Sequence, residues 1–230
     1  MKTIGILGGM SASSTQIYYR TLCDLTRERL GGLHSPELLI RSLDFAGIEK
    51  LQAAGKWGDA GAILNLEAKA LARGGARLLV LATNTMHKLA DQMMEGVGIP
   101  LLHIADATAA RITLAGFKAP GLMATAFTME QAFYTDRLKA AGLMPILPGV
   151  ADRAMTHRII YDELCRDITT SESRTIYEGI AGRLVENGAD CLILGCTEIG
   201  MLLHAGNVAV PVFDTTVIHC EAALEIALRE

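Results

Sequence analysis

A buried β-strand that ends in a polar turn is predicted by Gly75-Ala76-Arg77-Leu78-Leu79-Val80-Leu81-Ala82-Thr83-Asn84-Thr85. The pattern returns, at a constant offset of 113 residues, in Gly188-Ala189-Asp190-Cys191-Leu192-Ile193-Leu194-Gly195-Cys196-Thr197-Glu198. Thr83 and Cys196 therefore occupy equivalent positions at the carboxyl ends of equivalent strands. Because ligands bind at that edge of a parallel sheet, we expect one cleft with a proton-handling side chain on each wall.

Short apolar runs alternate with longer helical patterns along the whole chain, which is typical of a parallel α/β fold. Each half begins with a glycine-containing strand and turn and ends with a proline-led strand. We therefore predict two pseudo-symmetric α/β domains, each with a four-stranded parallel sheet, and a site at their interface. The predicted N-terminal domain spans 1–105 and is completed by a helix over 215–230, and the C-terminal domain spans 106–214.

The individual elements follow from apolar periodicity and from glycine or polar residues at their ends. The predicted strands are 3–7, 37–42, 77–81 and 100–103 in the first half and 120–124, 144–147, 190–194 and 210–213 in the second. The predicted helices are 13–30, 57–73, 152–165 and 173–187. A capping box in Thr128-Met129-Glu130-Gln131 predicts one more helix, which ends near Gly142.

Composition excludes several classes of function. The net charge is −4 and the 21 basic residues are scattered, which argues against binding to nucleic acid or to an anionic membrane surface. No apolar run approaches the roughly 18 residues of a membrane-spanning helix, and the N-terminus lacks the features of a signal peptide. The five cysteines form no spaced framework, so we expect free thiols and a cytoplasmic location.

Motifs for metals and nucleotides are absent. The six histidines are dispersed and no Cys-x-x-Cys or His-Glu-x-x-His occurs, so no metal site is expected. Gly8-Gly9-Met10-Ser11 lacks the spacing of a nucleotide-binding loop. It is either an anion-binding turn at a helix start or a tight turn with no further role.

Cys196 is the sharpest catalytic candidate. A thiol just before a helix start is expected to have its pKa lowered from about 8.5 toward neutrality, although plain burial would also explain a free cysteine. Asn84 and Thr85 offer short polar side chains beside helix-opening amides, as a carboxylate cradle or simply as a helix cap. His87 is expected on a helix face rather than as a base.

The motifs Thr83-Asn84-Thr85 and Gly195-Cys196-Thr197-Glu198 resemble the cofactor-independent aspartate/glutamate racemase family, and most closely its L-aspartate/glutamate-specific members. The segments Gly5–Ser11, Leu102–Ala107 and Pro211–Thr215 resemble it too, so the likeness runs through essentially the whole chain. Glu after Cys-Thr is typical of the aspartate racemase branch.

The resemblance implies racemisation of an acidic amino acid between two facing bases, without a cofactor, in a homodimer. Those bases are usually both cysteine, whereas this chain has Thr83 opposite Cys196, as the most similar subgroup does. A carbanion formed without an electron sink needs donors aimed at the α-carboxylate. The expected substrate-binding residues are Met10, Gln52, Asn84, Thr85, Thr125, Thr197 and Glu198, with Gln52 assigned by resemblance.

Two other functions stay open. A single-cysteine decarboxylase or isomerase of a dicarboxylate would need the thiol but no second base. A non-catalytic sensor of acidic amino acids would keep the cleft and lack the chemistry. Pyridoxal phosphate is disfavoured, because none of the seven lysines lies at a predicted strand exit.

Overall fold

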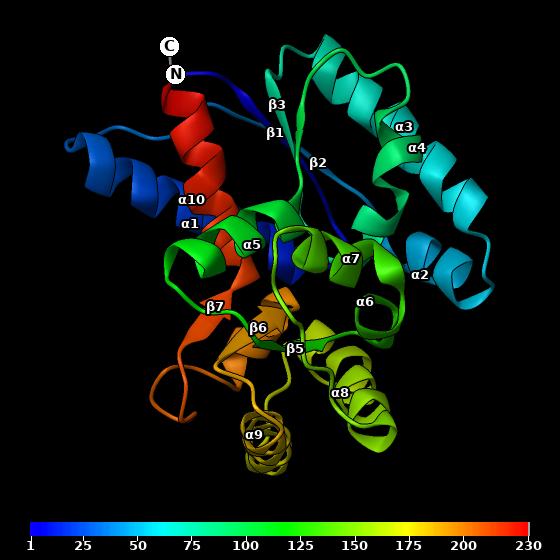
Figure 1. Ribbon diagram of the computed structural model, residues 1–230. Coiled ribbons are helices and arrows are strands. Elements are labelled where there is room, and N and C mark those ends of the chain that lie inside the picture. The colour runs from blue at the N-terminus through cyan, green and yellow to red at the C-terminus, as the bar shows by residue number, and fades with distance from the viewer. Residues whose placement is uncertain (230) are drawn as a thin grey trace. The chain divides into compact units, whose positions relative to one another are not determined.

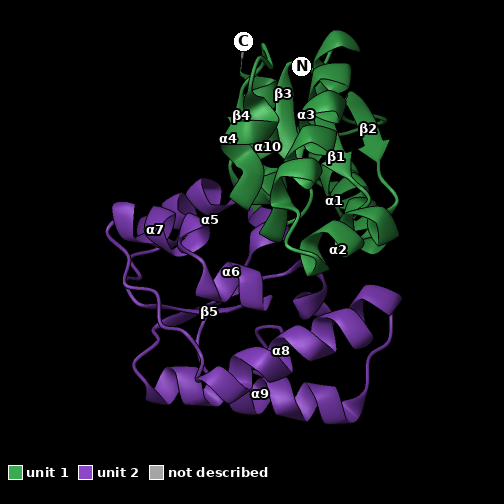
Figure 2. Ribbon diagram, turned by 90° about the vertical axis from the view of Figure 1, so that its right-hand side faces the viewer, with its two compact units in different colours: residues 1–103, 219–230 green, residues 104–218 purple. Residues whose placement is uncertain are grey.

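The computed structural model describes residues 1–229 of the 230-residue chain. It forms an α/β protein of two compact units, which Figure 2 shows in different colours. Unit 1 comprises Met1–His103 and His219–Glu230, and unit 2 comprises Ile104–Ile218. The predicted α/β class with parallel sheets is confirmed. The predicted domains 1–105 and 106–214 stay a prediction, because compactness alone does not show that either part folds independently.

Unit 1 contains a four-stranded parallel sheet of order β2-β1-β3-β4. Its strands are β1 (Ile4–Gly8), β2 (Leu38–Ser42), β3 (Leu78–Leu81) and β4 (Leu101–Leu102). All four predicted strands are present, with small shifts at their ends. The strand order reverses beside β1, so the loops after β1 and β3 leave the sheet at a topological switch point, where ligands bind in α/β folds.

Helices cover both faces of this sheet (Figure 1). One face packs on α3 (Trp57–Arg73), and the other packs on α1 (Ala12–Leu30) and α10 (Thr215–Leu228). Burial on both faces explains why the strands are apolar throughout rather than alternating. The Lys2 N–H donates to the Ala227 carbonyl (2.8 Å), so α10 ends beside the start of the chain. The remaining helices of unit 1 are α2 (Phe45–Ala53), the 3₁₀ helix η1 (Thr85–Leu89) and α4 (Ala90–Met94).

Unit 2 contains a three-stranded parallel sheet of order β5-β6-β7. Its strands are β5 (Pro120–Ala124), β6 (Cys191–Gly195) and β7 (Val212–Asp214). The predicted fourth strand, 144–147, is wrong. Only Ile146 forms a bridge, to Gly121 of β5. The Met144 and Ile146 N–H groups donate to the Lys118 and Pro120 carbonyls (both 2.8 Å). Pro148, the next residue in this alternation, has no N–H to donate, so the pairing does not continue.

The capping box predicted at Thr128 is also wrong. Thr125 is the residue that caps α6 (Ala126–Glu130), and its side chain accepts from the Thr128 N–H. The helical segment is interrupted at Gln131, whose backbone is extended, and resumes as α7 (Ala132–Ala140). The other helices of unit 2 are α5 (Ile104–Leu114), α8 (Val150–Asp162), η2 (Leu164–Arg166), α9 (Ser171–Glu186) and η3 (Thr197–Met201).

Candidate active site

The turn from β1 to α1 is held by its own hydrogen bonds. Gly9 adopts φ +86°, and its N–H donates to Thr15 Oγ1 (2.7 Å). Ser11 caps α1 by accepting from the Ser14 N–H (3.1 Å). The Gly9 amide is therefore engaged within the turn and is not a free donor for a carboxylate. Met10 is buried and packs in the core below this turn.

The exit of β3 carries Thr83, Asn84 and Thr85, all of which are buried. Thr83 is 9% exposed, and its carbonyl faces His87 Nδ1 at 2.7 Å. One residue earlier, the Ala82 carbonyl accepts from the Ser14 hydroxyl (2.9 Å), which joins the β3 exit to the start of α1. The backbone on each side of the Thr83 hydroxyl is thus fixed by a buried side chain.

Gln52 also lies in unit 1, beside the turn that follows β3. It is buried on α2, and its Nε2 donates to Met86 Sδ in η1 (2.9 Å). Leu7 of β1 pairs with Leu81 of β3, so the turns after both strands leave the same edge of the sheet. In unit 1, Gln52 therefore lies next to the residues that follow β3. The turn that contains Met10 leaves the sheet at the same edge. All five site residues predicted in the first half belong to unit 1.

Unit 2 repeats this arrangement with different chemistry. Cys196 follows β6 and precedes η3, as Thr83 follows β3 and precedes η1. Ala124 pairs with Gly195, so Thr125 and Cys196 leave neighbouring strands at one edge. The four site residues predicted in the second half, Thr125, Cys196, Thr197 and Glu198, are all in unit 2.

The Cys196 thiol contacts a buried carboxyl group. Its Sγ lies 3.0 Å from Glu198 Oε2, and Glu198 is only 2% exposed. Two effects raise the pKa of Cys196 well above its ordinary value. Burial is the larger effect, and the charge of Glu198 comes next. The predicted lowering of this pKa is therefore wrong. η3 is a 3₁₀ helix of only five residues. Its dipole is too weak to offset the effects of burial and of the neighbouring Glu198 charge on the pKa of Cys196.

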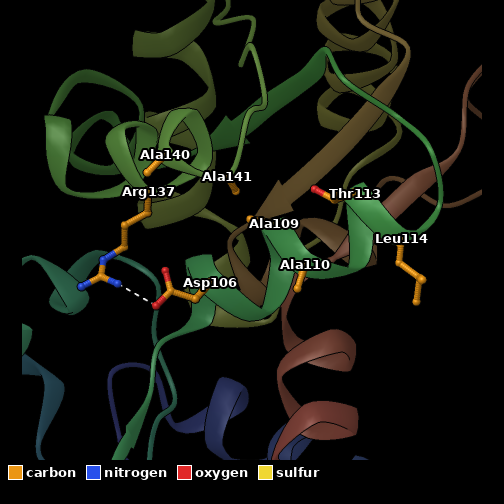
Figure 3. Close-up of a pocket in the computed structure, with 8 residues that line it drawn as sticks. All are labelled: Asp106, Ala109, Ala110, Thr113, Leu114, Arg137, Ala140 and Ala141. Atoms are coloured by element: carbon orange, nitrogen blue, oxygen red, sulfur yellow. Dashed lines mark hydrogen bonds and ion pairs between the residues drawn. The ribbon is translucent and has the colours of Figure 1, made fainter.

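A groove elsewhere in unit 2 contains none of the predicted site residues. Small side chains on α5 and α7 leave an open volume of about 620 Å³, shown in Figure 3. Its charged groups, Asp106 and Arg137, pair with each other at 2.6 Å. With its acid neutralised by its base, this groove offers no free proton-transfer group of its own.

Residues 7–223 match the family model described as Asp/Glu/Hydantoin racemase. The chain belongs to this family. A solved structure named "putative Asp/Glu Racemase", from Yersinia pestis, is 46% identical over 100% of both chains, with a TM-score of 0.92.

Two further relatives extend the comparison. An aspartate racemase homologue from Pyrococcus horikoshii OT3 is 34% identical over 100% of both chains, with a TM-score of 0.86. The broad specificity amino-acid racemase RacX of Bacillus subtilis (strain 168) is 24% identical over 228 residues, which cover 93% of this chain and 92% of that protein. Membership in the racemase family supports an amino acid racemase, and hence an isomerase.

Sequence reasoning missed a buried histidine cluster in this racemase. In unit 1 the His87 ring lies 4.5 Å from the His103 ring and 5.9 Å from the His219 ring, between centroids. The Thr83 carbonyl can only accept, so His87 must donate from Nδ1. His87 is thus a support of the β3 exit rather than the simple helix-face residue that was predicted. Only the His87 spacing from Thr83 offered a signal in the sequence.

Among residues 1–229, no three or more histidine, cysteine or acidic side chains are arranged so that they could hold a metal ion. Within the same residues, no helix combines the length and apolarity needed to cross a membrane. The five cysteines are all free thiols.

Proposed function

We propose that the chain racemises acidic amino acids, aspartate or glutamate, by moving the Cα proton between Cys196 and Thr83 without a cofactor. The observation that carries this proposal is the equivalence of the two strand exits. Each unit ends a central parallel strand in a proton-handling side chain, followed by a five-residue 3₁₀ helix. Family membership supports the reaction type. That the two exits serve one substrate is itself part of the proposal.

The chemistry divides between two bases. One removes the Cα proton from one face, and the other returns a proton to the opposite face, which inverts the centre. A thiol is the stronger acid and its thiolate the easier base to form, whereas the Thr83 hydroxyl ionises only with help. We assign the easier proton transfer to Cys196 and expect Thr83 to act through a water or a neighbouring polar group.

The carbanion must be stabilised by fixed dipoles, since no electron sink is invoked. We propose that the α-carboxylate is held by the Asn84-Thr85 turn and the Thr197 region, with Thr125 lining the site. Met10 and Gln52 are assigned to the remainder of the substrate. Thr125 and Thr197 are buried at the carboxyl edge of the unit 2 sheet, which suits short-range hydrogen bonding.

The acidic substrate class rests on the relatives. The Yersinia pestis protein carries an Asp/Glu racemase name at 46% identity, and the Pyrococcus horikoshii protein an aspartate racemase name at 34%. RacX is called broad in specificity, so a test must offer more than acidic amino acids. We also propose a homodimer, as the family resemblance implies.

The test is a chiral chromatography panel of L- and D-amino acids incubated with the metal-free protein. We expect inversion of aspartate or glutamate at least tenfold faster than of neutral or basic amino acids. Cys196→Ser should lower inversion by about 10²-fold or more, the scale of a lost acid–base group. Cys23→Ser, a half-buried cysteine on α1, is the matched control and should remain active. Undiminished inversion in Cys196→Ser refutes the assignment.

A further inference from the structure

A cavity in unit 1 lies at the opposite edge of the sheet from Thr83. Its volume is about 460 Å³, which falls in the range of roughly 300–1,000 Å³ typical of small-molecule sites. The end of α3, the start of β3 and the loop from α4 to β4 line it. Because Arg77 precedes β3 and Thr83 follows it, the whole length of that strand separates this cavity from the proposed catalytic position.

The charged residues that line this cavity are all positive. They are Lys69, Arg73 and Arg77, and no aspartate or glutamate lines it, although the chain as a whole has a net charge of −4. Among residues 1–229, none of these three side chains forms an ion pair. Like charges around one cavity repel each other, and an anion bound among them would relieve that repulsion.

The Lys69 ammonium group is held in place by a neutral side chain rather than by an acid. Lys69 is half-buried on α3, and its Nζ donates to Asn65 Oδ1 (2.7 Å). The Asn65 amide nitrogen donates in turn to the backbone carbonyls of Met93 and Glu95 (2.8 Å each), which fixes the direction of its oxygen. An ammonium group has three hydrogens, so Lys69 keeps its full charge and two further hydrogens to donate.

The loop side of the cavity is small and apolar. Val97 and Ile99 are half-buried and pack against the hydrophobic core of unit 1. Gly96 lies against the end of the Lys69 side chain, since a Cβ added to this glycine would be 3.4 Å from Lys69 Cε. The cavity therefore combines cationic groups with an apolar surface, as a ligand with an anionic group and an apolar body requires.

We propose that this cavity binds a small organic phosphate, a phosphate monoester with an apolar or aromatic body such as a nucleoside monophosphate. A phosphate monoester carries a charge of about −1.5 to −2 at pH 7 and three strong acceptor oxygens. One ammonium and two guanidinium groups match that charge and that number of oxygens better than they match a single carboxylate. The inference does not depend on the proposed racemisation, because no residue of this cavity belongs to the candidate active site.

The test is isothermal titration calorimetry of the full chain at low salt with adenosine monophosphate, inorganic phosphate, adenosine and citrate. We expect adenosine monophosphate to bind more tightly than inorganic phosphate, because its base can cover Val97 and Ile99. Adenosine, which lacks the charge, should bind at least tenfold more weakly than the monophosphate. Added salt should weaken the binding of both phosphates, since Arg73 and Arg77 are exposed.

Variants locate the binding in this cavity. Lys69→Met and Arg77→Gln each remove one charge, and each should raise the Kd for adenosine monophosphate about tenfold or more. Arg77 is exposed, so its variant folds even if Lys69→Met disturbs the contact with Asn65. The control Arg29→Gln removes the same charge from an exposed site on α1 and should bind as the wild type does.

Four results would overturn the proposal. These are no saturable binding of adenosine monophosphate, equal Kd values in Arg77→Gln and Arg29→Gln, citrate binding as tight as that of the monophosphate, and competition by saturating aspartate. The last result would place the nucleotide in the candidate active site instead. Aspartate inversion by Arg77→Gln should equal that of the wild type, because the cavity and the β3 exit lie at opposite ends of the strand.

Discussion

Single residues at the strand exits distinguish the two units. Thr83 has its flanking backbone carbonyls fixed by Ser14 and His87, and those bonds give its hydroxyl no acidity. Cys196 faces a buried carboxyl group instead. The same backbone position therefore carries a hydroxyl, which is a poor acid, in unit 1 and a thiol beside a buried carboxyl group in unit 2. We expect the two directions of turnover to differ accordingly in kcat.

Gly9 shows how one residue shapes the unit 1 turn. It has φ +86°, and an added Cβ would overlap the backbone nitrogen and oxygen of Leu43. We expect Gly9→Ala to lower the free energy of unfolding by about 2 kcal/mol or more. Gly55→Ala is the matched control, because Gly55 also has positive φ (+67°) but opens into free space. It should cost only about 1 kcal/mol, and equal losses in urea unfolding would contradict the steric account.

At the scale of elements, a hydrogen-bond chain joins α1, α10 and β4 in unit 1. His219 Nε2 faces the Leu102 carbonyl (2.9 Å), which can only accept, so the proton is on Nε2. Nδ1 then accepts from the Tyr18 hydroxyl (2.8 Å). Burial lowers the pKa of His219 to about 4, so the neutral ring is the form that fits.

Acid should therefore weaken the protein through His219. Between pH 6.5 and about 4 the unfolded chain binds a proton that the folded chain does not, so the free energy of unfolding falls as pH falls. We expect a contribution of about 2 kcal/mol between pH 7 and pH 5. Urea unfolding at both pH values should show a smaller difference in His219→Gln than in the wild type. His34→Gln, at an exposed site, should keep the wild-type difference, and no change in His219→Gln would contradict the account.

Elements were predictable where local sequence was sufficient. Glycine, an apolar run and a polar exit specify β3 and β6 without help from distant contacts, so both strands and their exits were predicted. Ile146 was misassigned because its apolar neighbours suggest a strand, whereas Pro148 lacks the N–H that would extend the pairing beyond a single bridge. Thr125 and Thr128 are both good caps, and only the observed hydrogen bond distinguishes them.

The candidate site was predictable for the same reason, and only in part. Thr83 and Cys196 were found because they end repeated strands. The Cys196 pKa was missed because the expected helix dipole is weak, while burial and the Glu198 contact are tertiary facts. In the histidine cluster, His219 lies more than a hundred residues along the chain from His87 and His103. No sequence spacing reports such a contact.

At the scale of the whole molecule, each unit presents the same strand, turn and 3₁₀ helix, with Thr83 at the strand exit in one and Cys196 in the other. Our central claim is that these two groups work on opposite faces of one Cα. If so, each base can be removed separately with a distinct result. Removal of the Thr83 hydroxyl should abolish inversion. Cys196 should still exchange the Cα proton that faces it for a solvent proton, because the thiol proton equilibrates with water.

The most direct test is proton NMR of L- and D-aspartate and glutamate in heavy water with wild type, Thr83→Ala and Cys196→Ser. We predict that the wild type loses the Cα–H signal with inversion. Thr83→Ala should lose it from one enantiomer only and without inversion, and Cys196→Ser should be slowed by about 10²-fold or more for both. Inversion by Thr83→Ala at the wild-type rate, or undiminished exchange by Cys196→Ser, would contradict the two-base account.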